Sequence, residues 1–178
     1  MIFEYFLGFT IVGCVVFLFY HILIYTQTKV PIISTPKKCL KNLMGEIEVD
    51  EESVIYELGS GNGDFAFAVA KLNPKRVVGY ELSPLHVAYC RLKAKLTGSG
   101  AEFFTKDFFK EDLSEVDLIY LFLVPKISTK LWKKIESECK PGTLVILHGS
   151  KIIDVEPERS ILADGGDSNS PKFHFYRV

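Results

Sequence analysis

The chain has 178 residues, of which 48% are apolar and 24% are charged, and its formal net charge is −1. Both fractions are near the globular average, so the composition excludes a disordered chain, a collagen and a disulfide scaffold. The mean hydropathy of +0.18 is high because 20 of the first 28 residues are apolar. Length and composition therefore predict one globular domain behind an apolar leader.

The leader, residues 1–28, contains an uncharged run from Tyr5 to Tyr25. A helix needs about 20 such residues to cross the roughly 30 Å core of a bilayer. A cleaved signal peptide has a basic start and a small-residue cleavage site, whereas this segment starts with Glu4. We therefore expect a transmembrane anchor, in preference to a signal peptide or a buried core helix.

Basic residues just after the leader indicate its orientation. Lys29, Lys37, Lys38 and Lys41 follow the apolar run, against one acidic residue before it. By the positive-inside rule, this asymmetry predicts a single-pass membrane protein whose C-terminal domain faces the cytoplasm. Contact with anionic lipid headgroups is a second interpretation of Lys37, Lys38 and Lys41.

The residues after the leader favour neither a nucleic acid nor a metal as a partner. Their formal charge is zero, 21 basic minus 21 acidic residues, so they contain no broad basic field. The four cysteines lack C-x-x-C pairing and zinc-ligand spacing and are interpreted as reduced thiols. The histidines His86, His148 and His174 are interpreted as structural residues.

Residues 29–45 are expected to form a linker and a short helix that precede the domain. Thr35-Pro36 predicts an N-cap followed by a proline at the first helical position. The helix is expected over Lys37–Met44, and Gly45 is expected to end it.

Strands and helices alternate through the domain, residues 46–178. Strands are expected over 53–58, 76–81, 101–105, 116–122 and 143–148. Helices are expected over 64–72, along Leu85, Tyr89, Leu92 and Leu96 as far as Gly98, and over 127–139. Ile152-Ile153 and Lys172–Val178 are expected as two closing strands. The alternation predicts a doubly wound, Rossmann-like α/β sheet, mostly parallel with an antiparallel C-terminal strand.

A glycine loop, Glu57-Leu58-Gly59-Ser60-Gly61-Asn62-Gly63-Asp64, joins the first strand to a helix. Glycines let the backbone turn sharply and approach a ligand without a Cβ in the way. Gly61–Ala66 also fits the G-x-G-x-x-G/A fingerprint of dinucleotide sites. However, Glu57 and Asp64 would repel a pyrophosphate at the helix N-terminus. The loop therefore favours a cationic ligand without phosphate, such as S-adenosylmethionine.

Acidic residues also follow the next two strands. Glu81 ends the second strand, where a carboxylate can accept both ribose hydroxyls of NAD or of S-adenosylmethionine. Asp107 follows the third strand and is expected to accept the adenine amino group, while Phe108 covers the ring. The predicted cofactor-binding residues are Glu57, Leu58, Gly59, Ser60, Gly61, Gly63, Glu81, Leu82, Asp107 and Phe108.

With these residues the chain resembles class I S-adenosylmethionine-dependent methyltransferases. Residues 57–63 are similar to their first motif, and Gly79-Tyr80-Glu81 to the acidic end of their second strand. Residues 30–150 resemble a narrower group, the small membrane-anchored lysine methyltransferases related to those of the ATP synthase C subunit and the adenine nucleotide translocase. The similar strings are Val30–Pro36, Gly79–Pro84, Tyr120–Pro125 and Lys140–Thr143. The short tail after His148 departs from that group.

The resemblance implies a methyltransferase that modifies a protein lysine at or near a membrane. In-line methyl transfer depends on orientation and a dry site, and it needs no covalent nucleophile. Carbonyls around Leu123-Val124 are candidates for aligning the lysine amine. Tyr120 is the one side chain considered for catalysis, although a tyrosine in a strand is more often a core residue.

Alternatives to a lysine methyltransferase stay open. The methyl acceptor can instead be a lipid or a small hydrophobic molecule. In a different class, the domain can bind an NAD-type nucleotide or serve as a catalytically idle membrane adaptor. The fourth strand lacks the Asn/Asp-Pro-Pro-Tyr tip that typifies enzymes acting on amines of nucleic-acid bases or on glutamine amides. Together with the neutral domain charge, this absence argues against nucleic acid as the substrate.

Overall fold

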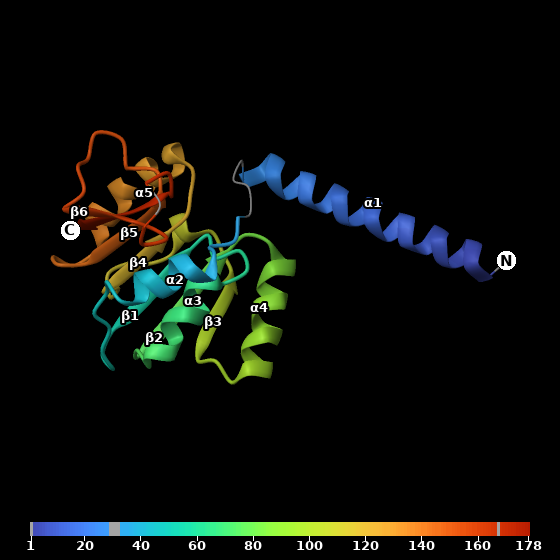
Figure 1. The fold of residues 1–178 in the computed structure, drawn as a ribbon, viewed down its shortest axis with the longest axis horizontal. Helices are drawn as coiled ribbons and strands as arrows, with labels where there is room; N and C mark the ends of the chain where they lie inside the picture. Colours follow the sequence, from blue (N-terminus) through green and yellow to red (C-terminus); the bar gives the residue numbers. More distant parts are fainter. Residues whose placement is uncertain (1, 29–32, 167) are drawn as a thin grey trace. The chain divides into compact units, whose positions relative to one another are not determined.

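The computed structural model describes residues 2–28, 33–166 and 168–178 and divides the chain into two compact units (Figure 1). The first unit, Met1–Ile32, contains helix α1 (Ile2–Thr28). The second unit, Ile33–Val178, contains the whole sheet and every other helix of the described residues. The hydrophobic core and the glycine loop therefore lie in the second unit.

Helix α1 exposes large apolar side chains wherever its side chains are described, among them Tyr5, Phe6 and Phe9. Within the described part of the chain, no helix is both long enough and apolar enough to cross a membrane. The transmembrane anchor expected over residues 1–28 is thus not shown and stays a prediction.

Seven strands form one sheet in the order β3-β2-β1-β4-β5-β7-β6. Their bounds are β1 (Val54–Leu58), β2 (Arg76–Glu81), β3 (Ala101–Thr105), β4 (Leu118–Leu121), β5 (Leu144–Gly149), β6 (Arg159–Leu162) and β7 (Lys172–Arg177). Strands β1 to β5 pair in parallel, whereas β7 runs antiparallel to both β5 and β6. The predicted Rossmann-like sheet is confirmed, and its strand order reverses between β1 and β4, where such sheets bind ligands.

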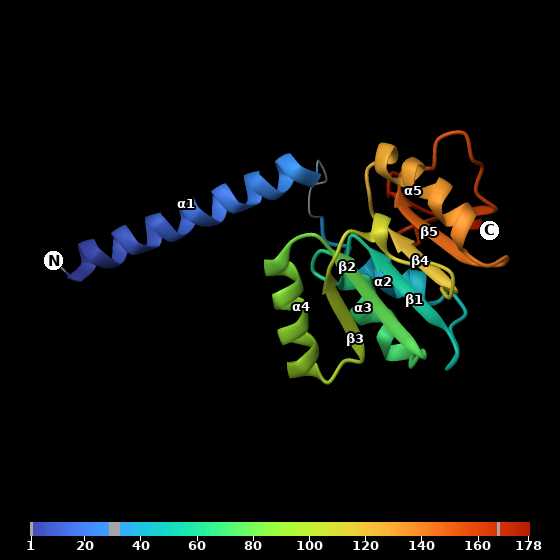
Figure 2. The same ribbon diagram turned by 180° about the vertical axis from the view of Figure 1, so that it is seen from behind.

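Helices cover both faces of this sheet (Figures 1 and 2). Their bounds are α2 (Lys37–Met44), α3 (Asp64–Val69) with the 3-10 turn η1 (Ala70–Leu72), α4 (Pro84–Thr97), the 3-10 turn η2 (Phe108–Lys110) and α5 (Pro125–Glu138). Because parallel crossovers are right-handed, α3 and α4 lie on one face and α5 on the other. Helix α2 packs beside α3 and buries Cys39, Leu40 and Leu43. The helices and the glycine loop are thereby held on a rigid sheet.

The structure corrects the predicted penultimate strand. Ile152-Ile153 form no strand, and the edge strand is β6. The Ile152 amide donates to the Tyr176 hydroxyl at 3.0 Å, and the Ile153 amide donates to Thr129 Oγ1 at 3.1 Å. These side-chain acceptors replace a strand partner, and the positive φ of Asp154 (62°) then turns the chain.

Candidate active site

The glycine loop needs glycine both for its conformation and for its close packing. Gly59, Gly61 and Gly63 have φ angles of 82°, 48° and 69°, which L-residues rarely adopt. A Cβ on Gly63 would lie 2.7 Å from the Phe103 ring, and one on Gly59 would lie 2.9 Å from Leu123 Cδ2. The loop is thus packed closely against Phe103 of β3 on one side and Leu123 after β4 on the other.

Glu57 ends β1 beneath this loop and is almost completely buried. Its Oε2 accepts a hydrogen bond from the Ala66 amide at 2.9 Å, in the first turn of α3. Burial raises the pKa of the Glu57 carboxyl to about 8, and the charges of Asp64 and Glu81 act in the same direction. Without a ligand, Glu57 is therefore largely protonated at pH 7, and a cationic ligand beside it would favour its ionised form.

Glu81 ends β2, and its carboxylate oxygens accept hydrogen bonds from the glycine loop and from the start of α4. Oε2 accepts from the Gly61 amide and Oε1 from the Ser83 amide, each at 2.9 Å. A carboxylate has about four acceptor positions, so two remain for the hydroxyls of a ribose. Close by, the buried Ser60 Oγ has no hydrogen-bond partner among the described residues. This residue set fits S-adenosylmethionine, with its positive charges and its vicinal hydroxyls.

The residues predicted to hold the adenine surround the end of β3. Asp107 Oδ1 accepts from the Phe109 amide at 3.0 Å and so caps the turn η2. Phe108 is buried beside Phe109, and Leu82, next to Glu81, is 42% exposed. The predicted contacts of Asp107 with the adenine amino group and of Phe108 with the ring stay predictions, as does the predicted binding of the cofactor by Leu82.

A second cluster, which is aromatic, occupies the ends of β4 and β5. Tyr120 is buried, and its ring stacks on Phe65 of α3 with centroids 4.2 Å apart. Its hydroxyl lies 3.0 Å from Thr35 Oγ1 and 3.2 Å from His148 Nδ1. Burial raises the pKa of the phenol, which stays protonated. The position of Tyr120 suits a residue that supports the site from the core.

His148 is the part of this cluster whose importance sequence reasoning missed. Its buried ring lies between Phe122 and Phe173, at centroid distances of 4.2 and 4.6 Å. Burial lowers the pKa of the imidazole to about 4, so it is neutral at pH 7. His148 Nε2 has no hydrogen-bond partner within the described chain. The one sequence signal for the cluster is that the strings Val30–Pro36 and Tyr120–Pro125 both belong to the resemblance.

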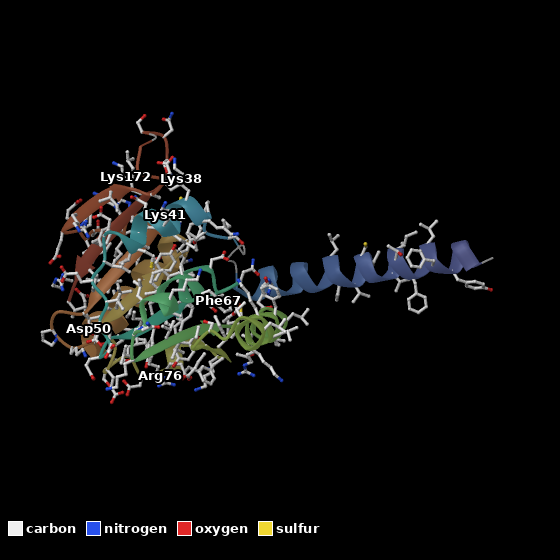
Figure 3. The ribbon with its side chains drawn as sticks, turned by 60° about the horizontal axis from the view of Figure 1, so that its bottom comes forward. Lys38, Lys41, Asp50, Phe67, Arg76 and Lys172 are labelled. Carbon is white, nitrogen blue, oxygen red and sulfur yellow. The ribbon has the colours of Figure 1, made fainter. Side chains whose placement is uncertain are left out.

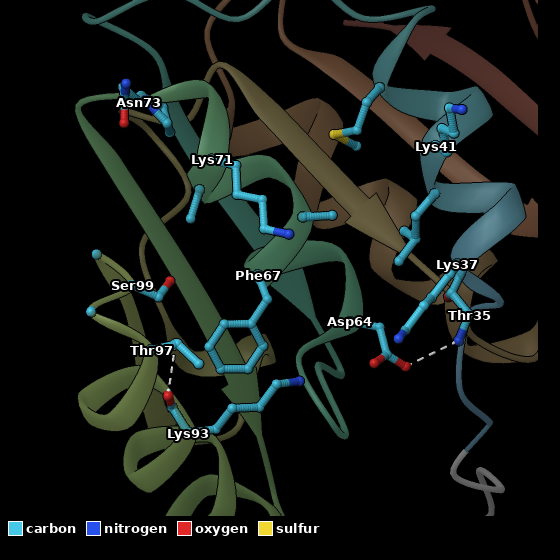
Figure 4. A pocket seen from close by; sticks show the side chains of 17 residues that line it. Thr35, Lys37, Lys41, Asp64, Phe67, Lys71, Asn73, Lys93, Thr97 and Ser99 are labelled. Carbon is cyan, nitrogen blue, oxygen red and sulfur yellow. Dashed lines mark hydrogen bonds between the residues drawn. The ribbon is translucent and has the colours of Figure 1, made fainter.

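Thr35 also corrects a prediction, because it does not cap α2. Pro36 takes the N-cap position, and no side chain caps the helix. The Thr35 amide donates to Asp64 Oδ2 at 3.2 Å (Figure 4), while Asn62 Nδ2 donates to Ser34 Oγ at 3.0 Å. With its hydroxyl on Tyr120, Thr35 ties the segment before α2 to both halves of the site.

Hydrogen bonds at the end of β4 distinguish the two carbonyls that were predicted to align the lysine amine. The Val124 carbonyl accepts from the Ile127 amide at 3.0 Å and the Ser128 amide at 3.1 Å, in the first turn of α5. Ser128 Oγ donates to it as well, at 3.3 Å. Val124, which was one of the two predicted candidates, is therefore already engaged, whereas the Leu123 carbonyl has no donor among the described residues.

Comparison with known proteins identifies the chemistry of this arrangement. Residues 57–159, from the glycine loop to β6, match the family described as the ANTKMT methyltransferase domain. The chain belongs to this methyltransferase family. The range includes Glu57, Glu81, Tyr120 and His148 and covers more than half of the chain.

Named relatives support the same assignment. A protein-lysine N-methyltransferase of Saccharolobus islandicus (strain REY15A) is 29% identical over 143 residues, which cover 79% of this chain and 89% of that protein. The human lysine N-methyltransferase of the ATP synthase C subunit is 31% identical over 118 residues, covering 65% of this chain. This second match spans only 50% of the human protein's length.

A solved structure extends the likeness to the cofactor. The RNA methyltransferase from Salinibacter ruber, in complex with S-adenosyl-L-homocysteine, has a TM-score of 0.74 and 30% sequence identity with this chain. The match covers 82% of this chain and 94% of the other. The 178-residue chain, as a member of the methyltransferase family, therefore uses S-adenosylmethionine as its cofactor. Among the described residues, no cluster of three or more His, Cys, Asp or Glu side chains could hold a metal ion.

Proposed function

We propose that the protein is a membrane-tethered methyltransferase that acts on a lysine side chain of a protein. The observation that carries this proposal is the likeness to the protein-lysine N-methyltransferase of Saccharolobus islandicus, which extends over most of both chains. The partial match to the human lysine N-methyltransferase of the ATP synthase C subunit points to the same acceptor group.

The residues of the site suit this reaction. S-adenosylmethionine supplies a methyl group that its sulfonium activates. The glycine loop and Glu81 hold the donor, and the Leu123 side chain packs against Gly59, which sets the end of β4 beside the loop. A lysine amine must be neutral to react, and surroundings as apolar as Phe122 and Leu123 lower its pKa by desolvation. The Leu123 carbonyl is the hydrogen-bond acceptor that would align the lysine amine.

The membrane part of the proposal is supported by the leader. Its uncharged run from Tyr5 to Tyr25 has the length of a bilayer span, and its described side chains are exposed and apolar. The lysines that follow the run favour a catalytic domain facing the cytoplasm. A tether would raise the effective concentration of a membrane-embedded substrate without any added contact.

Methylation of RNA is the second candidate, because the Salinibacter ruber neighbour is described as an RNA methyltransferase. The end of β4 argues against it. There the chain reads Leu123-Val124-Pro125 in place of an Asn/Asp-Pro-Pro-Tyr tip. A neutral domain charge also offers no broad field for a phosphate backbone.

Methyl labelling of membranes tests the proposal. The full chain is incubated with methyl-labelled S-adenosylmethionine and membranes, and portions are then treated with protease, with ribonuclease or with lipid solvent. We expect protease-sensitive label that mass spectrometry places on lysine and that the Glu81→Ala variant does not produce. Label that survives protease as lipid, or that ribonuclease releases, would contradict a protein acceptor.

A further inference from the structure

The apolar stripe of helix α4 faces outward. Leu85, Tyr89, Leu92 and Leu96 recur every three or four residues, and their exposed fractions are 54%, 52%, 58% and 77%. The opposite side of the helix, with Val87, Cys90 and Ala94, packs on the sheet. The spacing that predicts this helix therefore belongs to its more exposed face.

Three residues of this stripe, Tyr89, Leu92 and Leu96, form the row that needs a partner. From Tyr89 to Leu96 the helix rises about 10 Å, at roughly 1.5 Å per residue, so three large side chains present one apolar row. Single exposed leucines are common on protein surfaces, but contiguous apolar patches mark interaction sites.

Basic residues flank the stripe on both sides. Lys93 lies along one flank, Arg91 and Lys95 lie along the other, and α4 contains no acidic residue. The ammonium of Lys93 sits over the Phe67 ring of α3, 4.1 Å from its centroid. It thereby connects the stripe with the neighbouring surface of α3.

That neighbouring surface is a groove of about 890 Å³ across α3, between α2 and the end of α4 (Figure 4). Its lysines are Lys37, Lys41, Lys71 and Lys93, and none of them forms an ion pair with a described residue. The one acid in the lining, Asp64, already accepts a hydrogen bond from Thr35. The groove thus continues the positive surface of α4.

Acidic residues gather elsewhere on the domain. Five acidic residues lie in segment 46–52 and four in segment 111–117. These segments precede β1 and β4, so they lie at the amino ends of the strands, whereas the glycine loop follows a carboxyl end. Figure 3 labels Asp50, in the first of these segments, at the left of the view and Phe67 of α3 nearer its middle. The surface of α4 and the adjoining groove is therefore locally basic, while these two acidic segments lie at the other ends of the strands.

We propose that the α4 stripe and the adjoining lysines form a docking surface for an anionic lipid bilayer. An amphipathic helix with leucines and tyrosine on one face and basic residues at its flanks suits the interface of an anionic membrane. A second copy of the chain would bring Arg91, Lys93 and Lys95 against their equivalents, and an RNA would leave the leucines in water. The proposal concerns the domain itself, and it depends neither on α1 nor on the identity of the methyl acceptor.

Tryptophan fluorescence of the full chain tests this surface. The chain has one tryptophan, Trp132, which is buried in α5 on the other face of the sheet and serves as the reference. A Leu92→Trp variant is mixed with vesicles of brominated phosphatidylcholine, with or without phosphatidylserine. We expect blue-shifted and quenched emission with phosphatidylserine, and at least severalfold less quenching without it. In the Leu92→Trp background, Lys95→Gln should weaken docking about fivefold.

An Ile153→Trp variant is the matched control, because Ile153 is about as exposed as Leu92 but contacts the α5 side through Thr129. Its emission should be unchanged by either vesicle. Vesicles that carry the chain while the Leu92→Trp emission stays unquenched would overturn the proposal, since α1 alone would then hold the protein. A blue shift that follows protein concentration without lipid would indicate a second copy and would also overturn it. A failed methylation assay changes none of these readouts.

Discussion

The carboxyl ends of β1 and β2 (the first edge of the site) and the carboxyl ends of β4 and β5 (the second edge of the site) hold different kinds of residues. At β1 and β2, glycines and carboxylates meet backbone amides, and most of their partners are within about twenty residues in the chain. At β4 and β5, Thr35, Tyr120 and His148 come from distant segments and meet in the core. The first edge presents charge and backbone to a ligand, whereas the second supports its surroundings from within. Damage at the two edges should therefore be separable.

The largest effect is expected at the first edge, from Glu81→Ala. The substitution removes the acceptor proposed for the ribose hydroxyls and releases the Gly61 amide. Because each hydrogen bond to a charged group contributes about 1.5–3 kcal/mol, the affinity for S-adenosylmethionine should fall on the order of 100-fold or more. Isothermal titration calorimetry of the full chain measures this loss.

Glu102→Ala is the control for that measurement. Glu102 is an exposed acid on the neighbouring strand β3, where it pairs with Arg76. Its removal should leave cofactor affinity within about twofold, since exposed ion pairs contribute little. Equal losses in the two variants would mean that overall charge, and not the position of Glu81, governs binding.

The next largest effect is expected on the free energy of unfolding, when Gly63→Ala in the glycine loop is compared with Gly98→Ala after α4. The two glycines have nearly the same φ, 69° and 66°, so both variants should lose about 1–2 kcal/mol from backbone strain. An added Cβ meets the Phe103 ring at Gly63 but open space at Gly98. Overpacking should therefore cost Gly63→Ala about 2 kcal/mol more. Urea unfolding compares the two, and equal losses would show that Phe103 moves aside.

The contrast between the edges also explains what the sequence could predict. Gly59, Gly61 and Gly63 lie between a strand and a helix, and Glu57 and Glu81 end strands, so their neighbours in the chain place them. The parallel sheet follows from the alternation of strands and helices along the chain. Local pattern was sufficient because these contacts are local or are imposed by the sheet.

The rest depended on packing that no local pattern contains. The Thr35 hydroxyl bonds to a residue 85 positions away, which a capping rule cannot foresee. The α4 spacing predicts a helix correctly but does not tell which face is covered. Ile152-Ile153 looks like a strand, yet side-chain hydroxyls take up its amides. In each case a tertiary contact overrides the local preference.

A smaller effect is expected of pH on the affinity for S-adenosylmethionine, and it tests the charge at the first edge. In the free protein, Glu57 is protonated below its pKa of about 8, and a cationic ligand favours the ionised form. Binding therefore releases a proton, and affinity should rise about tenfold between pH 6 and pH 7. Above pH 8 the carboxyl is already ionised, so its contribution levels off. Calorimetry in buffers of different ionisation enthalpy measures both the slope and the proton.

Glu57→Gln keeps the shape of the side chain and an oxygen for the Ala66 amide, but it cannot ionise. The variant should bind S-adenosylmethionine with little dependence on pH over this range. A wild-type slope that persists in Glu57→Gln would assign the proton to another group and would remove the argument that buried charge attracts the ligand.

The smallest effect is expected at the second edge, from Tyr120→Phe. The hydroxyl links Thr35 to His148, and its loss leaves two buried polar groups short of a partner. The free energy of unfolding should fall by about 1–2 kcal/mol, while cofactor affinity stays within about twofold. Thr35→Val breaks one of the same bonds, so the double variant should lose less than the sum of the singles. Additive losses, or a Tyr120→Phe chain that no longer binds S-adenosylmethionine, would mean that the two edges are not separate. If the losses are non-additive, Tyr120 acts by holding Thr35 in the segment before α2 and supports the site from the core.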